Sequence, residues 1–107
     1  MTTPLAATEA DVQAIIADYA RMRGWLVAHF RPARVADGWR TAGSYDAKGY
    51  PDLTLAKRGR VLHIECKGPR GVVPPEQEAW LAATDGLLAT PTNLDAILAT
   101  IKEADRV

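Results

Sequence analysis

Two carboxylates and a lysine interrupt the apolar pattern of "GYPDLTLAKRGRVLHIECKG", residues 49–68 of the chain. They are Asp52, Glu65 and Lys67. Because alternate residues of a strand share a face, Glu65 and Lys67 lie together in "VLHIECK", whereas the opposite face is purely apolar. Carboxylate oxygens suit Mg²⁺, and a neighbouring lysine can orient a water or stabilise charge on a phosphorus. The residue types and their spacing therefore indicate a metal-assisted hydrolytic nuclease site.

The two carboxylates meet only if the strand pair has one particular register. A turn that is symmetric about its "RG" dipeptide places Asp52 directly opposite Glu65, with Cβ atoms about 4.5–5.5 Å apart. Two like charges that face each other destabilise a sheet unless something positive lies between them. We therefore expect a divalent cation here, with the backbone carbonyl of Cys66 as a further oxygen ligand. The alternative is a salt bridge on a solvated sheet face, in which Lys67 pairs with one of the carboxylates.

Helical and strand periodicities predict the elements that position these residues. Capping-box patterns, Thr8 with Asp11 and Thr92 with Asp95, indicate where the first and last helices begin. In chain order we expect a helix at about residues 9–23, the strands "WLVAHF", "DLTLA" and "VLHIECK", a helix in "EQEAWLAAT", a short strand in "LLAT" and a final helix.

Residues 31–49 show neither periodicity and are rich in Arg, Gly and small side chains. We therefore expect a long loop here, and a basic loop with aromatic residues could grip a phosphate backbone or stack on a base. The alternative is a β-hairpin excursion in which Trp39 packs as a lid on the core.

The charges are unevenly distributed along a chain whose net charge is zero. Residues 21–70 contain eleven Lys and Arg side chains against four carboxylates, a net charge of +7 that the rest of the chain balances. This asymmetry predicts a basic surface that attracts DNA, and the alternative is that the fold intermixes the charges in space. The candidate DNA contacts are Arg31, Arg34, Arg40, Lys48 and Arg70.

The composition of the chain limits its class. With 107 residues and 48% hydrophobic content, we expect one domain over residues 1–107. No apolar run approaches the roughly 20 residues of a membrane span, and no signal peptide is evident. A single cysteine cannot form an internal disulfide, which favours a reducing compartment, so we expect a cytoplasmic protein without a membrane partner.

The segments "GYPD", "IECK" and "PPEQEAW", together with the "RGW" strand start, resemble the VRR-NUC family of the PD-(D/E)XK nuclease superfamily over about residues 8–101. The resemblance implies a restriction-endonuclease-like αβββαβ core, here with a C-terminal helix, and Mg²⁺ or Mn²⁺ dependence without a small-molecule cofactor. It makes Asp52 and Glu65 metal ligands, Lys67 the catalytic lysine and Gln77 an auxiliary catalytic residue. Glu9 matches a further glutamate that reaches toward the metal, although it could equally serve the dipole of the first helix.

Proteins of this kind resemble stand-alone nucleases of phages or bacteria that act as homodimers on branched DNA, including four-way junctions. We therefore expect a structure-selective DNA endonuclease. A non-catalytic nucleic-acid-binding module on the same fold and a sequence-specific restriction-type nuclease are the alternatives. The chain departs from the family in a shorter segment at residues 82–93, in Thr90 before Pro91 where relatives have an arginine, and in lacking the "VRR" motif.

Overall fold

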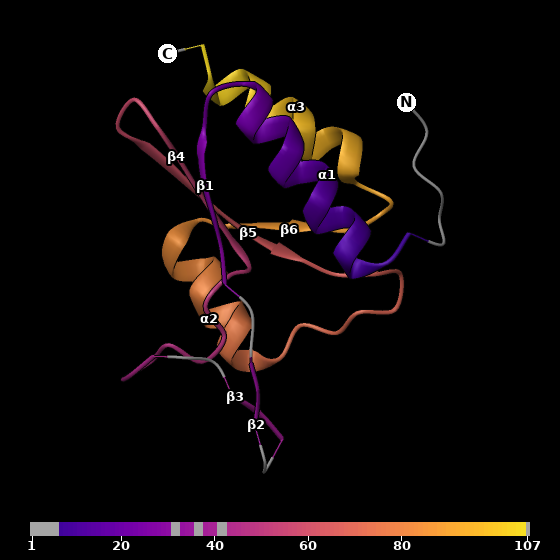
Figure 1. Ribbon diagram of the computed structural model, residues 1–107, viewed down its shortest axis with the longest axis vertical. Helices are drawn as coiled ribbons and strands as arrows, with labels where there is room; N and C mark the ends of the chain where they lie inside the picture. Colours follow the sequence, from indigo (N-terminus) through magenta and orange to yellow (C-terminus); the bar gives the residue numbers. More distant parts are fainter. Residues whose placement is uncertain (1–6, 31–32, 36–37, 41–42, 107) are drawn as a thin grey trace.

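The computed structural model describes residues 7–30, 33–35, 38–40 and 43–106. Within these residues, three helices and a four-stranded mixed sheet form the main body of the protein (Figure 1). In chain order the elements are α1 (Glu9–Met22), β1 (Leu26–His29), β2 (Ala33–Val35), β3 (Gly38–Arg40), β4 (Leu53–Lys57), β5 (Arg60–Cys66), α2 (Pro75–Thr84), β6 (Leu87–Ala89) and α3 (Leu94–Ala104). This confirms the prediction of a mixed α/β fold.

The sheet has the strand order β1-β4-β5-β6. β4 pairs antiparallel with both β1 and β5, whereas β6 pairs parallel with β5. Figure 1 shows α1 and α3 side by side on one face of this sheet and α2 on the other. No helix of the described ranges is long and apolar enough to cross a membrane.

Helix α1 begins as its sequence predicts. The hydroxyl of Thr8 accepts a hydrogen bond from the N–H of Asp11 at 3.1 Å, and the Asp11 carboxylate accepts one from the N–H of Thr8 at 2.9 Å. This reciprocal capping box satisfies two N–H groups that the helix cannot pair internally. Val12, Ile16 and Ala20 follow at intervals of four residues and are buried against the sheet.

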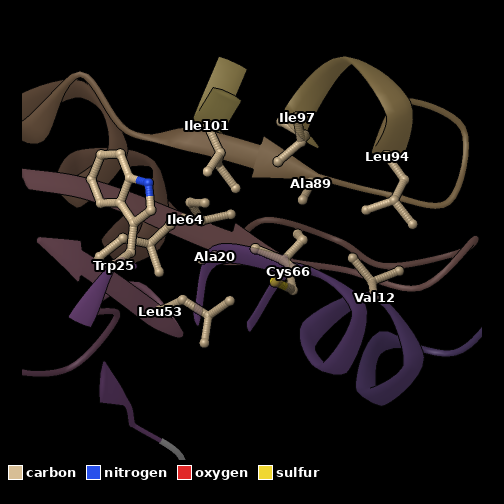
Figure 2. Close-up of a cluster of buried hydrophobic side chains, with 12 residues drawn as sticks. Val12, Ala20, Trp25, Leu53, Ile64, Cys66, Ala89, Leu94, Ile97 and Ile101 are labelled. Atoms are coloured by element: carbon tan, nitrogen blue, oxygen red, sulfur yellow. The ribbon is translucent and has the colours of Figure 1, made fainter. Parts of the chain in front are cut away.

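The hydrophobic core fills the space between the sheet and the α1/α3 layer (Figure 2). Leu53 and Leu55 of β4 and Ile64 and Cys66 of β5 are fully buried on this face, as strand alternation predicts. Burial of one such aliphatic side chain contributes about 1.5–3 kcal/mol. The core side chains from other elements are Val12, Ile16, Ala20, Trp25, Ala89, Leu94, Ile97 and Ile101.

Helix α3 begins differently from the prediction. Its N-cap residue is Asn93, and the predicted capping box of Thr92 with Asp95 is wrong. Asn93 Oδ1 accepts from the N–H of Thr90 at 2.7 Å, and its Nδ2 donates to the carbonyl of Leu88 at 2.7 Å. The Asn93 side chain thus satisfies backbone groups at the end of β6, three and five residues before it, and makes no capping hydrogen bond to α3.

The long loop expected at residues 31–49 is wrong in its first half. Ala33–Val35 and Gly38–Arg40 form a separate two-stranded antiparallel sheet, which is the hairpin alternative. Strands of three residues are too short to display a periodicity, which is why the sequence shows none. The proposed lid position of the Trp39 side chain lies outside the described part of the chain.

An ionic cluster joins three elements at the end of the sheet where β4 turns into β5. Asp105, which follows α3, accepts hydrogen bonds from Arg23 Nε and from Lys57 Nζ, each at 2.5 Å. Lys57 Nζ also donates to the backbone carbonyl of Arg23. The hydrogen bonds from Lys57 and Arg23 lower the pKa of Asp105.

We expect the Asp105→Asn variant to have a lower melting temperature than the wild type at neutral pH, because Lys57 and Arg23 lose their common anionic partner. The stabilising effect of Asp105 is complete above the ordinary Asp pKa of 3.8 and is lost as the pH falls through the lower folded-state value. Melting curves measured across this pH range should show the difference between variant and wild type shrinking in acid. Asp18→Asn, an exposed change on α1, is the control. An equal melting temperature at neutral pH would contradict this account.

Candidate metal-binding and catalytic site

The β4–β5 register brings the two predicted carboxylates together. Lys57 pairs with Arg60, and the ladder continues to Leu53 opposite Ile64. The turn residues Arg58 and Gly59 have φ values of 50° and 80°, as a two-residue type I′ hairpin turn requires. One further step along this ladder places residue 52 opposite residue 65, which confirms the predicted symmetric turn.

Asp52 links three neighbouring strands where β4 begins. Its backbone carbonyl accepts a hydrogen bond from the N–H of Phe30 at 2.9 Å, just beyond β1. Its carboxylate oxygen Oδ2 accepts one from the N–H of Cys66 in β5, also at 2.9 Å. These bonds orient the Asp52 carboxylate toward the end of β5, where Glu65 lies.

Glu65 is almost completely buried, with 2% of its surface exposed. No other charged residue in the described part of the chain is buried to this extent. Its Oε2 lies 3.5 Å from Lys67 Nζ, and its buried Oε1 has no hydrogen-bond partner within the described ranges. Burial raises the pKa of Glu65 to about 8, the Asp52 carboxylate acts in the same direction, and Lys67 opposes them. The salt-bridge alternative is therefore right about the Lys67 contact but wrong about a solvated face.

The face that carries Glu65 is covered by α2 and by an aromatic cluster centred on Tyr50. The ring of Tyr50 packs edge to face with those of Trp80 at 4.9 Å, Phe30 at 5.6 Å and His63 at 5.7 Å between centroids. Its hydroxyl lies 3.0 Å from the hydroxyl of Thr54. No local pattern in the sequence singles out Phe30 and Tyr50, because only the tertiary structure brings these rings together beside the carboxylates.

Glu9 approaches the site from the first turn of α1. A Cβ added to Gly68 would lie 3.3 Å from the backbone nitrogen of Glu9, so the glycine permits the close approach of α1 to the segment after β5. Partial burial raises the pKa of the Glu9 carboxyl, Asp52 raises it further, and Lys67 lowers it. The carboxyl therefore lies within electrostatic reach of Asp52 and Lys67, and Gln13 Nε2 lies 3.5 Å from its Oε2.

Gln77 lies in the first turn of α2, the helix that covers the Glu65 face. Its side-chain oxygen is buried and, in the part of the chain that is described, accepts no hydrogen bond. Glu65 and Gln77 thus each contain a buried oxygen that lacks a donor, and such oxygens are costly unless a donor or a cation satisfies them.

A hard divalent cation fits the donor set of Asp52, Glu65 and the backbone carbonyl of Cys66. Among the described residues, no group of three or more His, Cys, Asp or Glu side chains is placed to hold a metal ion. Mg²⁺ does not need such a group, because it is commonly held by one or two carboxylates together with waters and phosphate oxygens. The Cys66 thiol is excluded as a ligand, since it lies in the core and burial raises its pKa.

The five predicted DNA contacts fall into two sets. Lys48 and Arg70 are exposed, and Lys48 Nζ lies 3.7 Å from Glu76 of α2. The side chains of Arg31, Arg34 and Arg40 lie outside the described part of the chain. The fold also intermixes some of the charges, because Glu76 and Asp105 from the acidic parts of the chain pair with lysines and an arginine of residues 21–70.

Comparison of the chain with protein-family models, with curated proteins and with solved structures gave no match in any of the three. The assignment of the site therefore depends on the residues and their geometry, and the family resemblance stays a prediction.

We expect the stability of the protein to fall as the pH rises from about 4.5 to about 8 because of Glu65. Its folded-state pKa of about 8 lies above the ordinary value of 4.5, so between these values the folded state binds more protons than the unfolded state. Glu65→Gln removes this dependence, and at about pH 8 it should unfold with a free energy about 2–4 kcal/mol higher than that of the wild type. Denaturant unfolding at a series of pH values measures the difference.

The pH series contains its own reference, since near pH 4.5 both proteins carry a neutral group at position 65 and should be similarly stable. Millimolar Mg²⁺ or Mn²⁺ should stabilise the wild type most at alkaline pH, because a ligand carboxyl must lose its proton to bind, and should stabilise Glu65→Gln much less. Equal pH dependence of the two proteins would contradict the raised pKa of Glu65.

Proposed function

We propose that this protein is a metal-dependent endonuclease that hydrolyses phosphodiester bonds in DNA. The observation that carries the proposal is the position of Asp52 opposite a buried Glu65 whose Oε2 lies 3.5 Å from Lys67 Nζ. A salt bridge alone would need neither the second carboxylate nor the burial of Glu65. The arrangement is one that a cation and a phosphate together would satisfy.

Mg²⁺ or Mn²⁺, when bound, would polarise the phosphodiester and lower the pKa of a water. Asp52, Glu65 and the carbonyl of Cys66 would hold it, and Glu9 is a further ligand candidate. The N–H of Cys66 keeps the Asp52 carboxylate oriented. Glu65 would hold the ion in its deprotonated form. Lys67 either orients the attacking water or stabilises the negative charge that develops on the phosphoryl oxygens. Gln77 offers its buried side-chain oxygen to the attacking water.

The order of the elements supports the proposal that this is a restriction-endonuclease-like αβββαβ core of the VRR-NUC type. Apart from the β2–β3 hairpin, the chain runs α1, β1, β4, β5, α2 and β6, and α3 follows as a C-terminal helix. By this resemblance we propose a structure-selective enzyme that acts on branched DNA.

We expect the wild type to cleave a supercoiled plasmid and a four-way junction with Mg²⁺ or Mn²⁺ and to leave both intact in EDTA. Lys67→Ala should slow cleavage about 10²- to 10⁴-fold, the usual effect of losing a group that transfers protons or stabilises charge. Initial rates on gels or from end-labelled strands measure the effect. Lys102→Ala, an exposed lysine of α3, is the matched control and should cleave at the wild-type rate.

Two results would remove the assignment: no metal-dependent cleavage of any substrate, or undiminished cleavage by Lys67→Ala. DNA binding without cleavage would favour the non-catalytic module. Cleavage at one fixed sequence in linear duplex would favour the restriction-type enzyme.

We also propose that the protein acts as a homodimer, because a chain of 107 residues is small relative to a four-way junction and a two-fold dimer presents two sites for two symmetric cuts. Light scattering coupled to size exclusion should give twice the chain mass of 11.6 kDa at assay concentrations. A monomer under these conditions would refute the dimer and would leave the single-site chemistry unaffected.

A further inference from the structure

Phe30 is a half-exposed aromatic residue at the edge of the acidic site. The residue is 51% exposed, and its N–H donates to the carbonyl of Asp52 at 2.9 Å. The β1–β4 ladder ends with His29 opposite Leu53, so one further step places Phe30 opposite Asp52. Because directly opposed residues of an antiparallel pair share a face, Phe30, Asp52 and Glu65 form one row on the face away from the core.

The ring of Phe30 packs against a cluster of other aromatic rings. It packs edge to face against Tyr50, whose own ring is fixed by Trp80 at 4.9 Å and by the contact of its hydroxyl with Thr54. Trp80 is in turn held by a hydrogen bond from its Nε1 to the carbonyl of Asp46 at 2.8 Å. This chain of contacts supports the ring of Phe30 beside the carboxylates, and Phe30 itself remains half exposed to solvent.

A nucleobase is the flat group that accompanies a phosphate bound at this site. Aromatic side chains stack on bases with little regard to sequence, because every base presents a π-face. Inside a duplex both faces of a base are already stacked on neighbours, so only an unpaired or extruded base can stack on a protein ring.

We propose that Phe30 is a substrate-binding residue on which a base next to the scissile phosphate stacks, and that the substrate therefore presents an unpaired nucleotide at this position. Such nucleotides occur at branches, flaps and single-stranded ends. The inference rests on the proposed nuclease function for the location of the phosphate, and it adds the reason why the site selects structure rather than sequence.

The test uses two DNA probes that contain 2-aminopurine, whose fluorescence is quenched on stacking. One probe places the analogue in an unpaired nucleotide at a branch, and the other places it within a continuous duplex. With Ca²⁺ in place of Mg²⁺, the wild type should change the fluorescence of the branched probe, and Phe30→Leu should not. Phe30→Leu should also bind the branched probe about 5- to 100-fold more weakly, while Phe30→Tyr retains both the signal and the affinity.

Val61→Ala is the matched control, since Val61 is a similarly exposed apolar residue, 54% exposed, on the same face of the sheet near the turn. It should behave as the wild type with both probes. Circular dichroism melting should show that all variants fold.

Two results would overturn the stacking role. In one, Phe30→Leu changes the fluorescence of the branched probe as much as the wild type does. In the other, Phe30→Leu loses affinity equally for the branched and the duplex probes. This failure is distinguishable from failure of the nuclease assignment. Metal-dependent cleavage that requires Lys67 but is indifferent to Phe30 removes only the stacking role. A Phe30-dependent fluorescence change in a protein that cleaves nothing supports stacking and removes only the enzyme.

Discussion

The two-residue turn at Arg58 and Gly59 sets the pairing of β4 with β5. The position of Asp52 opposite Glu65 depends on that pairing. Both turn residues have positive φ values, which match the right-handed twist of the flanking strands. A shift of the register by one residue would send Asp52 to the core face and a core leucine to the site face. The aliphatic core opposes that shift, because Leu53 and Leu55 would lose their burial. The apolar face therefore enforces the geometry of the polar one.

The opposite face of the sheet contains an unfavourable electrostatic interaction between two neighbouring carboxylates. Glu65 is buried beside a second carboxylate, and one lysine only partly compensates, so the pKa of Glu65 rises to about 8. A structural ion pair would be expected to satisfy both oxygens of a buried carboxylate, yet within the described ranges Oε1 of Glu65 has no partner. Strongly shifted pKa values of buried groups are typical of functional sites.

Elements distant in sequence complete the site from three directions. α1 brings Glu9 close through the contact with Gly68, α2 covers the sheet face and carries Gln77, and the end of β1 places Phe30 next to Asp52. None of these elements belongs to the hairpin that carries the carboxylates. The proposed selectivity for unpaired DNA arises from that convergence, since the aromatic surface and the carboxylates lie in one row.

The sequence by itself determined what depends on neighbours within a few residues. The capping box of Thr8 and Asp11, the alternation of the two strands and the symmetric turn were all predicted correctly, because turn chemistry and periodicity are local properties. The order of the main helices and strands followed from the same signals.

Only the tertiary structure decided how deeply each polar group is buried and which distant group it meets. The burial of Glu65 and the pairing of Asp105 with Arg23 and Lys57 both join segments far apart in the chain. The position of Phe30 also depends on long-range contacts, because it follows from the pairing of β1 with β4 and from the ring contact with Tyr50. Burial and charge pairing are sums over long-range contacts, and a local pattern does not contain them.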